Sequence, residues 1–194
     1  MNPNDYLEDL LIHEGDVPWL YCDSRGNVTV GIGHLVATSS DAAALPMVRP
    51  DGTAASDLEK SDAWHAVKAA YDDEEPEAAG HYRTLSTIRL PVDVAESLAC
   101  ELLASTFLPG VAKLCPGVEG FPLPARRALV DLAYNLGVGG LARFPAMLAA
   151  CNAGNWLAAS EQCHRLGVNQ ARNDWTAQCF RDAAAEAVTP GPQT

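Results

Sequence analysis

The sequence has few basic residues and lacks the spacing patterns of several common site types. Only 13 of its 194 residues are Lys or Arg, against 25 Asp and Glu, so its formal net charge is −12 at pH 7. No concentrated basic stripe occurs, which disfavours nucleic acid as a partner. The six cysteines form no CxxC pair and the histidines are not at zinc-ligand spacings. We therefore expect no metal and no other cofactor.

The chain also lacks a long apolar run and a recognisable leader. No stretch approaches the ~18 consecutive apolar residues of a membrane span. The N-terminal MNPNDYLEDLL is acidic, unlike a secretory signal. We expect a protein that is made in the cytoplasm without a signal peptide and is not inserted in a membrane.

Residue spacing near the N-terminus predicts a helix followed by a β-hairpin. The apolar residues that repeat at three and four positions, in line with Glu14, are Tyr6, Leu7, Leu10 and Leu11. Gly15 then ends the helix. The β-favouring runs WLY and VTV flank the turn-forming group Ser24-Arg25-Gly26-Asn27, which predicts a hairpin.

The rest of the chain reads as loops and helices, which makes the expected fold class α+β, mainly α. Residues 38–60 show no sustained period and are expected to be loop. Proline and glycine at 109 and 110 should break or kink the long helix that starts at Asp93. The predicted helices cover 62–71, 93–107, 125–136, 144–152, 155–166 and 173–187.

We expect one domain over residues 1–188, followed by a disordered tail at 189–194. A cleft should separate a hairpin-bearing lobe, 1–90, from a helical lobe, 91–188. The net charge is −5 over 1–50, −8 over 51–102 and +1 over 103–194. The acidic run Asp72–Glu77 reads as a solvated loop. The alternative is a docking surface for a basic partner, such as a delivery or immunity protein.

The stretch HEGDVPWLYCDSRGNVTVGIGH contains the most informative group of polar residues. Eight residues separate Glu14 from Asp23, and five separate Asp23 from Thr29. Two carboxyl groups across a cleft, one protonated and one ionised, are the minimum machinery for cleaving a glycosidic bond. Taken singly, Glu14 is better explained as a helix-end charge, Asp23 as a turn-former and Thr29 as an ordinary strand residue. The combination favours a catalytic site.

This spacing resembles the phage-type lysozymes, the endolysin-like muramidase family. The family signature is Glu, eight residues, Asp or Cys, five residues and Thr, followed by GxGH, here Gly31-Ile32-Gly33-His34. The block from Asp131 to Leu148 is similar to the family's helix, glycine turn and phenylalanine-bearing helix. A weaker match is Arg172-Asn173 with Trp175 and Phe180. Together these segments cover about half of the chain.

The resemblance implies a lysozyme-like two-lobe fold and hydrolysis of the β-1,4 bond between N-acetylmuramic acid and N-acetylglucosamine in peptidoglycan. It implies that Glu14 is the general acid and that ionised Asp23 positions water for inversion. Thr29 would hold that water or the Asp23 carboxylate.

The resemblance assigns further residues less directly. Leu35, Tyr134 and Gln162 fall where family members line the glycan groove. Asn135 is either a substrate contact or a helix-end hydrogen bonder. His34 is expected to be structural near the site, and Arg172 to pair with Glu14 and orient it.

Other functions remain open. A related glycosidase could act on chitin or chitosan, and a lysozyme-like module could bind glycans without cleaving them. A nucleophilic Cys22 is disfavoured because neither His13 nor His34 lies at a defensible spacing for its base. Within the muramidase reading, the acidic charge, the absent signal and the long middle stretch favour a bacterial effector over a phage endolysin. Either would reach the cell wall or periplasm after release or secretion.

Overall fold

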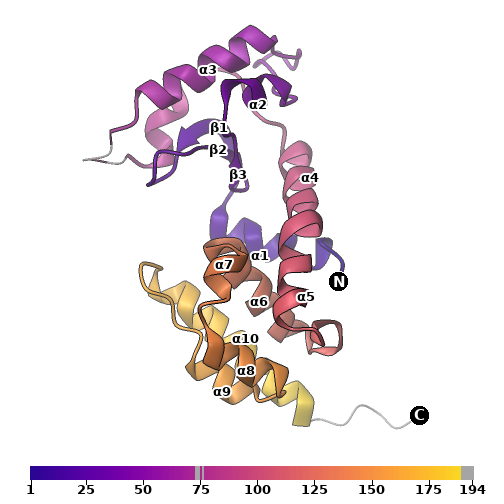
Figure 1. The fold of residues 1–194 in the computed structure, drawn as a ribbon. Helices are drawn as coiled ribbons and strands as arrows, with labels where there is room; N and C mark the ends of the chain where they lie inside the picture. Colours follow the sequence, from indigo (N-terminus) through magenta and orange to yellow (C-terminus); the bar gives the residue numbers. More distant parts are fainter. Residues whose placement is uncertain (73–74, 76, 189–194) are drawn as a thin grey trace. The chain divides into compact units, whose positions relative to one another are not determined.

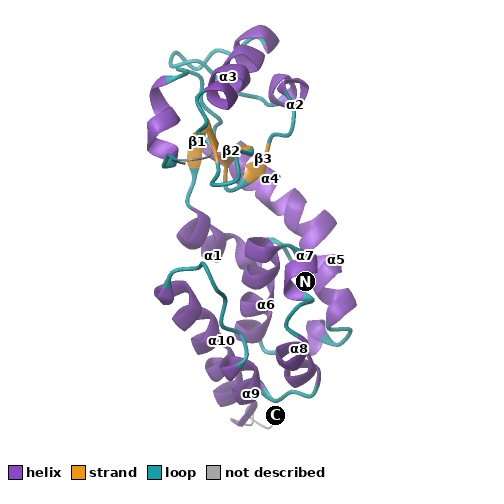
Figure 2. Ribbon diagram, turned by 60° about the vertical axis from the view of Figure 1, so that its left-hand side comes forward, coloured by secondary structure: helices purple, strands orange, loops and turns teal. Residues whose placement is uncertain are grey.

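The computed structural model describes residues 1–72, 75 and 77–188, and it shows a mainly helical α+β protein (Figures 1 and 2). A small N-terminal three-stranded antiparallel sheet is followed by most of the helices. The predicted tail at 189–194 lies outside the described residues. So do three residues of the acidic run Asp72–Glu77, namely Asp73, Glu74 and Pro76.

The chain divides into two compact units, described separately below. The sheet unit is Leu10–Cys100, and the helical unit is Met1–Asp9 with Glu101–Thr194. The predicted cleft between a lobe of residues 1–90 and a lobe of residues 91–188 stays a prediction.

The predicted N-terminal helix and hairpin are both present. Helix α1 covers Asn4–Glu14 and ends at Gly15, whose φ of +72° suits glycine. Strand β1 (Val17–Cys22) pairs antiparallel with β2 (Val28–Gly31). A third strand, β3 (His34–Leu35), pairs with β2 and was not predicted. Strand β3 begins at His34, the last residue of GIGH. It is only two residues long, so the sequence shows no alternating apolar and polar run that would predict it.

The two faces of this sheet carry different kinds of residue. Directly opposed residues of antiparallel strands point to the same side. Cys22 lies opposite Val28, and both are buried. The Cys22 thiol lies 3.7 Å from the carbonyl oxygen of Val67, so this face packs toward helix α3 (Asp57–Ala69). The other face carries Tyr21, Thr29 and Leu35 as one cross-strand row.

Gly31 is required by both its conformation and its neighbours. Its φ is +62°, and a Cβ placed there would lie 3.0 Å from the Ala95 Cβ and 3.2 Å from Leu90 Cδ2. Gly33 also has a positive φ, of +68°. Glycine at this position lets the backbone run close to Leu90 and Ala95.

Helix α2 (Ser39–Ala44) shows that the prediction of loop over 38–60 is wrong in part. Thr38 caps the helix, because its hydroxyl accepts from the Asp41 N–H while the Asp41 carboxylate accepts from the Thr38 N–H. The signal was a capping box, Thr-x-x-Asp, which the search for an apolar period did not detect.

Helix α3 begins at Asp57, five residues earlier than predicted, and packs beside α2 (Figure 2). Its capping box joins Ser56 and Glu59. The Arg49 guanidinium donates to both oxygens of Glu59, at 2.8 and 2.6 Å. These bonds, together with those from Ser56, lower the pKa of Glu59 to about 2.

We predict that Glu59→Gln lowers the melting temperature near neutral pH and has a shrinking effect in acid. A carboxyl group whose pKa is lower in the folded state than its ordinary value stabilises the folded state. For Glu59 this stabilisation is fully present at pH values above the ordinary pKa of 4.5. This stabilisation is lost as the pH falls from about 4.5 toward 2. Melting curves of wild type and variant across that range test the prediction, with the exposed Glu186→Gln as control. A constant difference would contradict it.

The remaining helices lie mostly in the helical unit, with short 3₁₀ turns at Ala79–Thr84 and Val118–Gly120. Helix α6 ends before Gly137, as predicted, because φ is +75° there. Helix α9 is shorter than the predicted 155–166. The bounds are α4 Val92–Leu102, α5 Leu108–Leu114, α6 Leu123–Leu136, α7 Val138–Leu141, α8 Pro145–Asn152, α9 Trp156–Glu161 and α10 Gln170–Val188.

Pro109 does not break the helix that contains it. Helices α4 and α5 join through a π-helical stretch, Leu103–Phe107, and the Leu108 N–H bonds to the Leu103 carbonyl. The π-helical turn shifts the backbone hydrogen bonds from i→i−4 to i→i−5 just before Pro109, which has no N–H to donate. The helix therefore continues through the proline. Among the described residues, the run Val92–Leu114 is long and apolar enough to cross a membrane, with a mean hydropathy of 1.3. Core helices pass the same test, so this is weak evidence for a span.

Four cysteines lie in one hydrophobic core cluster of the helical unit: Cys115, Cys151, Cys163 and Cys179. All six cysteines of the chain are free thiols. Burial raises the pKa of Cys151 and Cys179 to about 12 and that of Cys115 to about 11. Protonated, buried thiols of this kind are unreactive.

Candidate functional site

The three predicted catalytic residues all belong to the sheet unit. Glu14 is the last residue of α1, and Asp23 directly follows β1; both are half-buried. Thr29 lies in β2 and is 6% exposed. The local fold therefore holds the two carboxyl groups on different elements that are joined by a short connection.

Tyr21 links the two carboxylates electrostatically, and the sequence analysis did not identify it. Burial, followed by the negative charges of Glu14 and Asp23, raises the pKa of its phenol to about 12. Both carboxylates therefore act on one phenol. Tyr21 also lies directly opposite Thr29, on the same face of the sheet. The signal in the sequence was its position two residues before Asp23, which puts both on one face of a strand.

The Asp23 carboxylate is held by its own turn. Oδ1 accepts from the backbone N–H groups of Arg25 and Asn27, at 2.8 and 2.9 Å, and Oδ2 accepts from the Asn27 side-chain amide at 3.0 Å. These hydrogen bonds fix the orientation of the carboxylate, which a base that positions water requires.

Hydrogen bonds connect Thr29 to Asp23 through Asn27. The Thr29 hydroxyl donates to the Asn27 carbonyl oxygen at 3.2 Å, and Asn27 in turn donates twice to Asp23. Asn27 is thus the residue that connects this pair. Sequence reasoning included it only as part of a turn-forming group.

His34 lies on the other side of the sheet from Thr29. It is paired with Val30, whose side chain is fully buried, and is itself half-buried. Alternation along β2 places Val30 and Thr29 on opposite faces. This placement agrees with a structural role for His34.

Asp16 is a second half-buried carboxyl group close to Glu14 in the sequence. Its Oδ1 is buried and has no hydrogen-bond partner among the described residues. Burial, and then the negative charge of Glu96, raise the pKa of Asp16. A carboxyl group in such surroundings stays protonated to higher pH, as a general acid must. Asp16 is therefore the natural comparison for Glu14 in any test of the acid.

The other predicted residues lie in the helical unit, except Leu35, which is 56% exposed on β3. Gln162 is exposed at the end of α9. The Tyr134 ring lies 4.8 Å from the Phe107 ring, centroid to centroid. Asn135 accepts from Arg165 at 3.3 Å, which supports its reading as a helix-end hydrogen bonder. A groove shared by these residues and Leu35 stays a prediction.

Arg172 belongs to a buried ionic network centred on Asp131. Its Nε and Nη2 lie 3.0 and 2.6 Å from Asp131 Oδ1. Arg165 Nη1 lies 2.9 Å from Oδ2 of the same carboxylate, and both side chains of that pair are 1% exposed. The predicted pairing of Arg172 with Glu14 stays a prediction, because the two residues belong to different units.

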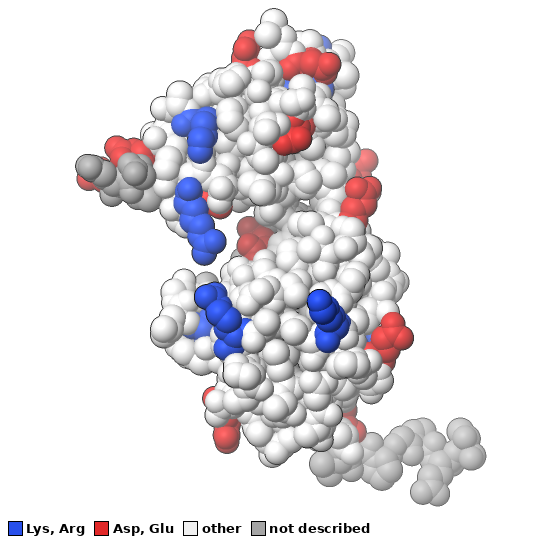
Figure 3. All heavy atoms as spheres, viewed as in Figure 1, with Lys and Arg blue, Asp and Glu red and all other residues white. Residues whose placement is uncertain are grey.

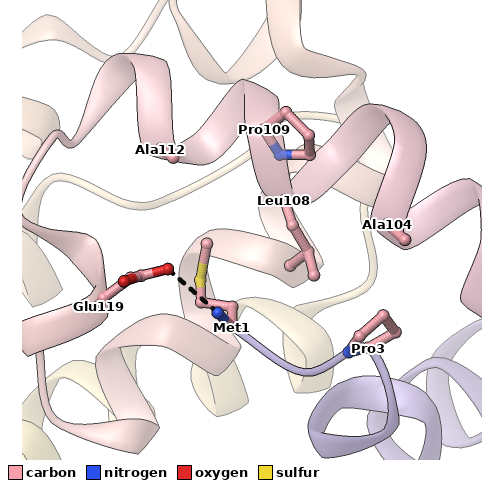
Figure 4. A pocket seen from close by; sticks show the side chains of 7 residues that line it. All are labelled: Met1, Pro3, Ala104, Leu108, Pro109, Ala112 and Glu119. Carbon is pink, nitrogen blue, oxygen red and sulfur yellow. Dashed lines mark hydrogen bonds and ion pairs between the residues drawn. The ribbon is translucent and has the colours of Figure 1, made fainter.

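A different cavity of the helical unit contains none of the predicted residues. It measures about 280 Å³ and lies beside the N-terminus, where the Met1 amine is 3.3 Å from Glu119 Oε1 (Figure 4). Leu108 and Pro109 of α5 form part of its apolar wall.

The described residues include no group of three or more His, Cys, Asp or Glu side chains placed to hold a metal ion. On the face in Figure 3, Lys and Arg side chains are scattered rather than gathered in a stripe. Cys22 points into the core, and burial raises the pKa of its thiol. These features add no support for metal chemistry or a cysteine nucleophile.

If the protein is the glycoside hydrolase that its sequence resembles, Asp23→Asn should lower the rate of glycan hydrolysis at least about a hundred-fold with little change in melting temperature. Asparagine keeps the Oδ1 acceptor, and the Asn27 amide can turn to accept from the new NH₂ group. Only the negative charge and the basic oxygen are lost. Hydrolysis assays with melting curves test this.

The matched control for that variant is Asp51→Asn, an exposed carboxylate in a similar turn that accepts from the Thr53 N–H and hydroxyl. It should retain activity. If both variants lost activity equally, the loss would not be specific to Asp23, and a catalytic role for its carboxylate would not be supported.

No protein-family model matches this chain, and no curated protein sequence matches it significantly.

Proposed function

We propose that the protein is a peptidoglycan muramidase with a lysozyme-like two-lobe fold. It would hydrolyse the β-1,4 bond between N-acetylmuramic acid and N-acetylglucosamine. The observation that supports this most is that the charges of both Glu14 and Asp23 act on the phenol of Tyr21, a residue that pairs with Thr29 across the sheet. Two carboxyl groups on separate elements are what acid/base glycoside hydrolysis requires.

The two carboxyl groups would have different roles. Glu14, half-buried at the end of α1, would protonate the leaving glycosidic oxygen. Asp23, oriented by three hydrogen bonds, would take a proton from the attacking water. Attack from the opposite face of the sugar would invert the anomeric carbon.

The proposed location of action is the bacterial cell wall, after release or secretion from the cytoplasm. Peptidoglycan glycan strands would be the main partner. A delivery or immunity protein would be a second one if the protein is an antibacterial effector.

Digestion of purified peptidoglycan, with chitin oligosaccharides in parallel, tests the proposal. We expect soluble fragments with reducing N-acetylmuramic acid ends, and proton NMR of fresh products should show the inverted anomer. Retention would instead mean a nucleophilic carboxylate and a short carboxyl separation. Cleavage of chitin alone would identify the related glycosidase, and glycan binding without reducing ends would identify a binding module. Either of these results would overturn the muramidase assignment.

A further inference from the structure

A cavity of about 180 Å³ opens beside the turn that holds Asp23. Its wall includes Asn27, which donates two hydrogen bonds to Asp23, and Leu35, which lies opposite Thr29 on the sheet. Helix α3 contributes Trp64 and Lys68 to the wall, and the other lining residues are Gly26, Val28, Val36 and Ala37. The cavity therefore lies beside the turn that orients the candidate base, and helix α3 forms part of its wall.

The apolar part of this wall is rigid and open. The Trp64 indole N–H donates to the Val36 carbonyl oxygen at 2.8 Å, which fixes the plane of the ring. Leu35 is 56% exposed, so its side chain is accessible to a ligand. Ligand sites typically combine apolar and aromatic walls with a few placed polar groups. The volume equals that of about six water molecules, so it suits one sugar substituent or ring.

Lys68 is the single charged residue among those that line the cavity. Its Nζ donates to the Gly26 carbonyl oxygen at 2.6 Å and lies 5.9 Å from the centroid of the Tyr71 ring. An ammonium group has three donors, so this bond leaves two for a ligand. Among the described residues, no carboxylate lines the cavity, so Lys68 gives it a local positive charge that would attract an anionic group.

We propose that this cavity receives the carboxylate-bearing arm of a muramic acid residue, with Lys68 binding the carboxylate and Trp64 and Leu35 contacting the sugar. N-acetylmuramic acid differs from N-acetylglucosamine by a lactyl arm, which ends in a carboxylate or continues into a carboxylate-bearing peptide. Lys68 would thus distinguish peptidoglycan from neutral chitin. This inference rests on the proposed function and names the feature of the substrate that the site recognises.

The test measures binding of two probes by calorimetry: the N-acetylglucosaminyl-N-acetylmuramic acid disaccharide with a free carboxylate, and chitobiose. In Lys68→Met we expect affinity for the acidic disaccharide to fall on the order of ten-fold, as for loss of a charged hydrogen bond. Affinity for chitobiose should stay unchanged. Lys68→Arg should keep most of the preference, and added salt should reduce it in the wild type.

The matched control is Lys113→Met, which removes one exposed positive charge from α5, outside this cavity. It should bind both probes like the wild type. Equal losses of both probes in Lys68→Met would overturn the inference, because they would mean that Lys68 only supports the Gly26 turn. No loss for either probe would also overturn it. If Lys68→Met does not fold, two other measurements test the inference. It is supported if Lys68→Arg keeps the preference for the acidic disaccharide and added salt reduces that preference in the wild type, and it is overturned if salt has no effect.

Failure of this inference and failure of the proposed function give different results. If the wild type cleaves peptidoglycan while Lys68→Met keeps its preference for the acidic disaccharide, only the cavity assignment fails. If no glycan is cleaved but the Lys68-dependent preference is present, the cavity assignment stands and the muramidase proposal fails.

Discussion

The Glu14→Gln variant is expected to fold normally and to lose about a thousand-fold or more of its hydrolytic activity. Glutamine has nearly the same shape as glutamic acid but cannot donate a proton as a carboxylic acid does. General acid catalysis contributes about 10²–10⁴-fold to such reactions. Glu14 is half-buried at the end of α1, so the exchange should not disturb the core. Release of soluble fragments from purified peptidoglycan, with melting curves, measures both parts of the prediction.

Two comparison variants make this result specific to Glu14. Glu8→Gln makes the same change at an exposed position of the same helix and should retain full activity. Asp16→Asn changes the neighbouring carboxyl group whose pKa burial raises. If Asp16→Asn abolished hydrolysis and Glu14→Gln did not, the general acid would be Asp16. Near-wild-type lysis by both folded variants would remove this segment from the catalytic mechanism.

The Asp131→Asn variant is expected to be strongly destabilised, by about 3–5 kcal/mol, because it removes the carboxylate from a buried ionic network. Among the described residues, Asp131 is the one carboxylate that Arg165 contacts, and that guanidinium is 1% exposed. A buried cation without a counter-charge costs several kcal/mol. For a chain of this length the melting temperature should fall by about 10 °C or more.

The control for Asp131→Asn is Asp174→Asn, an exposed carboxylate on α10 that accepts from Gln170. Surface changes of this kind shift stability within about 0.5 kcal/mol. Thermal unfolding followed by circular dichroism compares the two variants. Similar, small shifts in both would show that the network is not needed for folding.

The positions of several elements and of the candidate catalytic residues could be predicted because their signals are local. The three- and four-residue spacing before Glu14 predicts α1, and Gly15 marks its end, since glycine readily adopts positive φ. The WLY and VTV runs predict β1 and β2. The spacing of Glu14, Asp23 and Thr29 identifies a candidate site. Helix α2 could also have been predicted, because its capping box is written in four consecutive residues.

What depends on distant residues could be learned only from the tertiary structure. The network of Asp131, Arg165 and Arg172 joins three separate segments, and no short pattern marks it. Pro109 continues a helix because a π-helical turn changes the register before it. The approach of α3 to the hairpin places Lys68 and Trp64 beside Asn27. The sequence by itself determined the local elements and the candidate acids, since each depends on neighbours along the chain. Only the tertiary structure decided what surrounds those acids, because burial and electrostatic contact arise between segments far apart in the sequence.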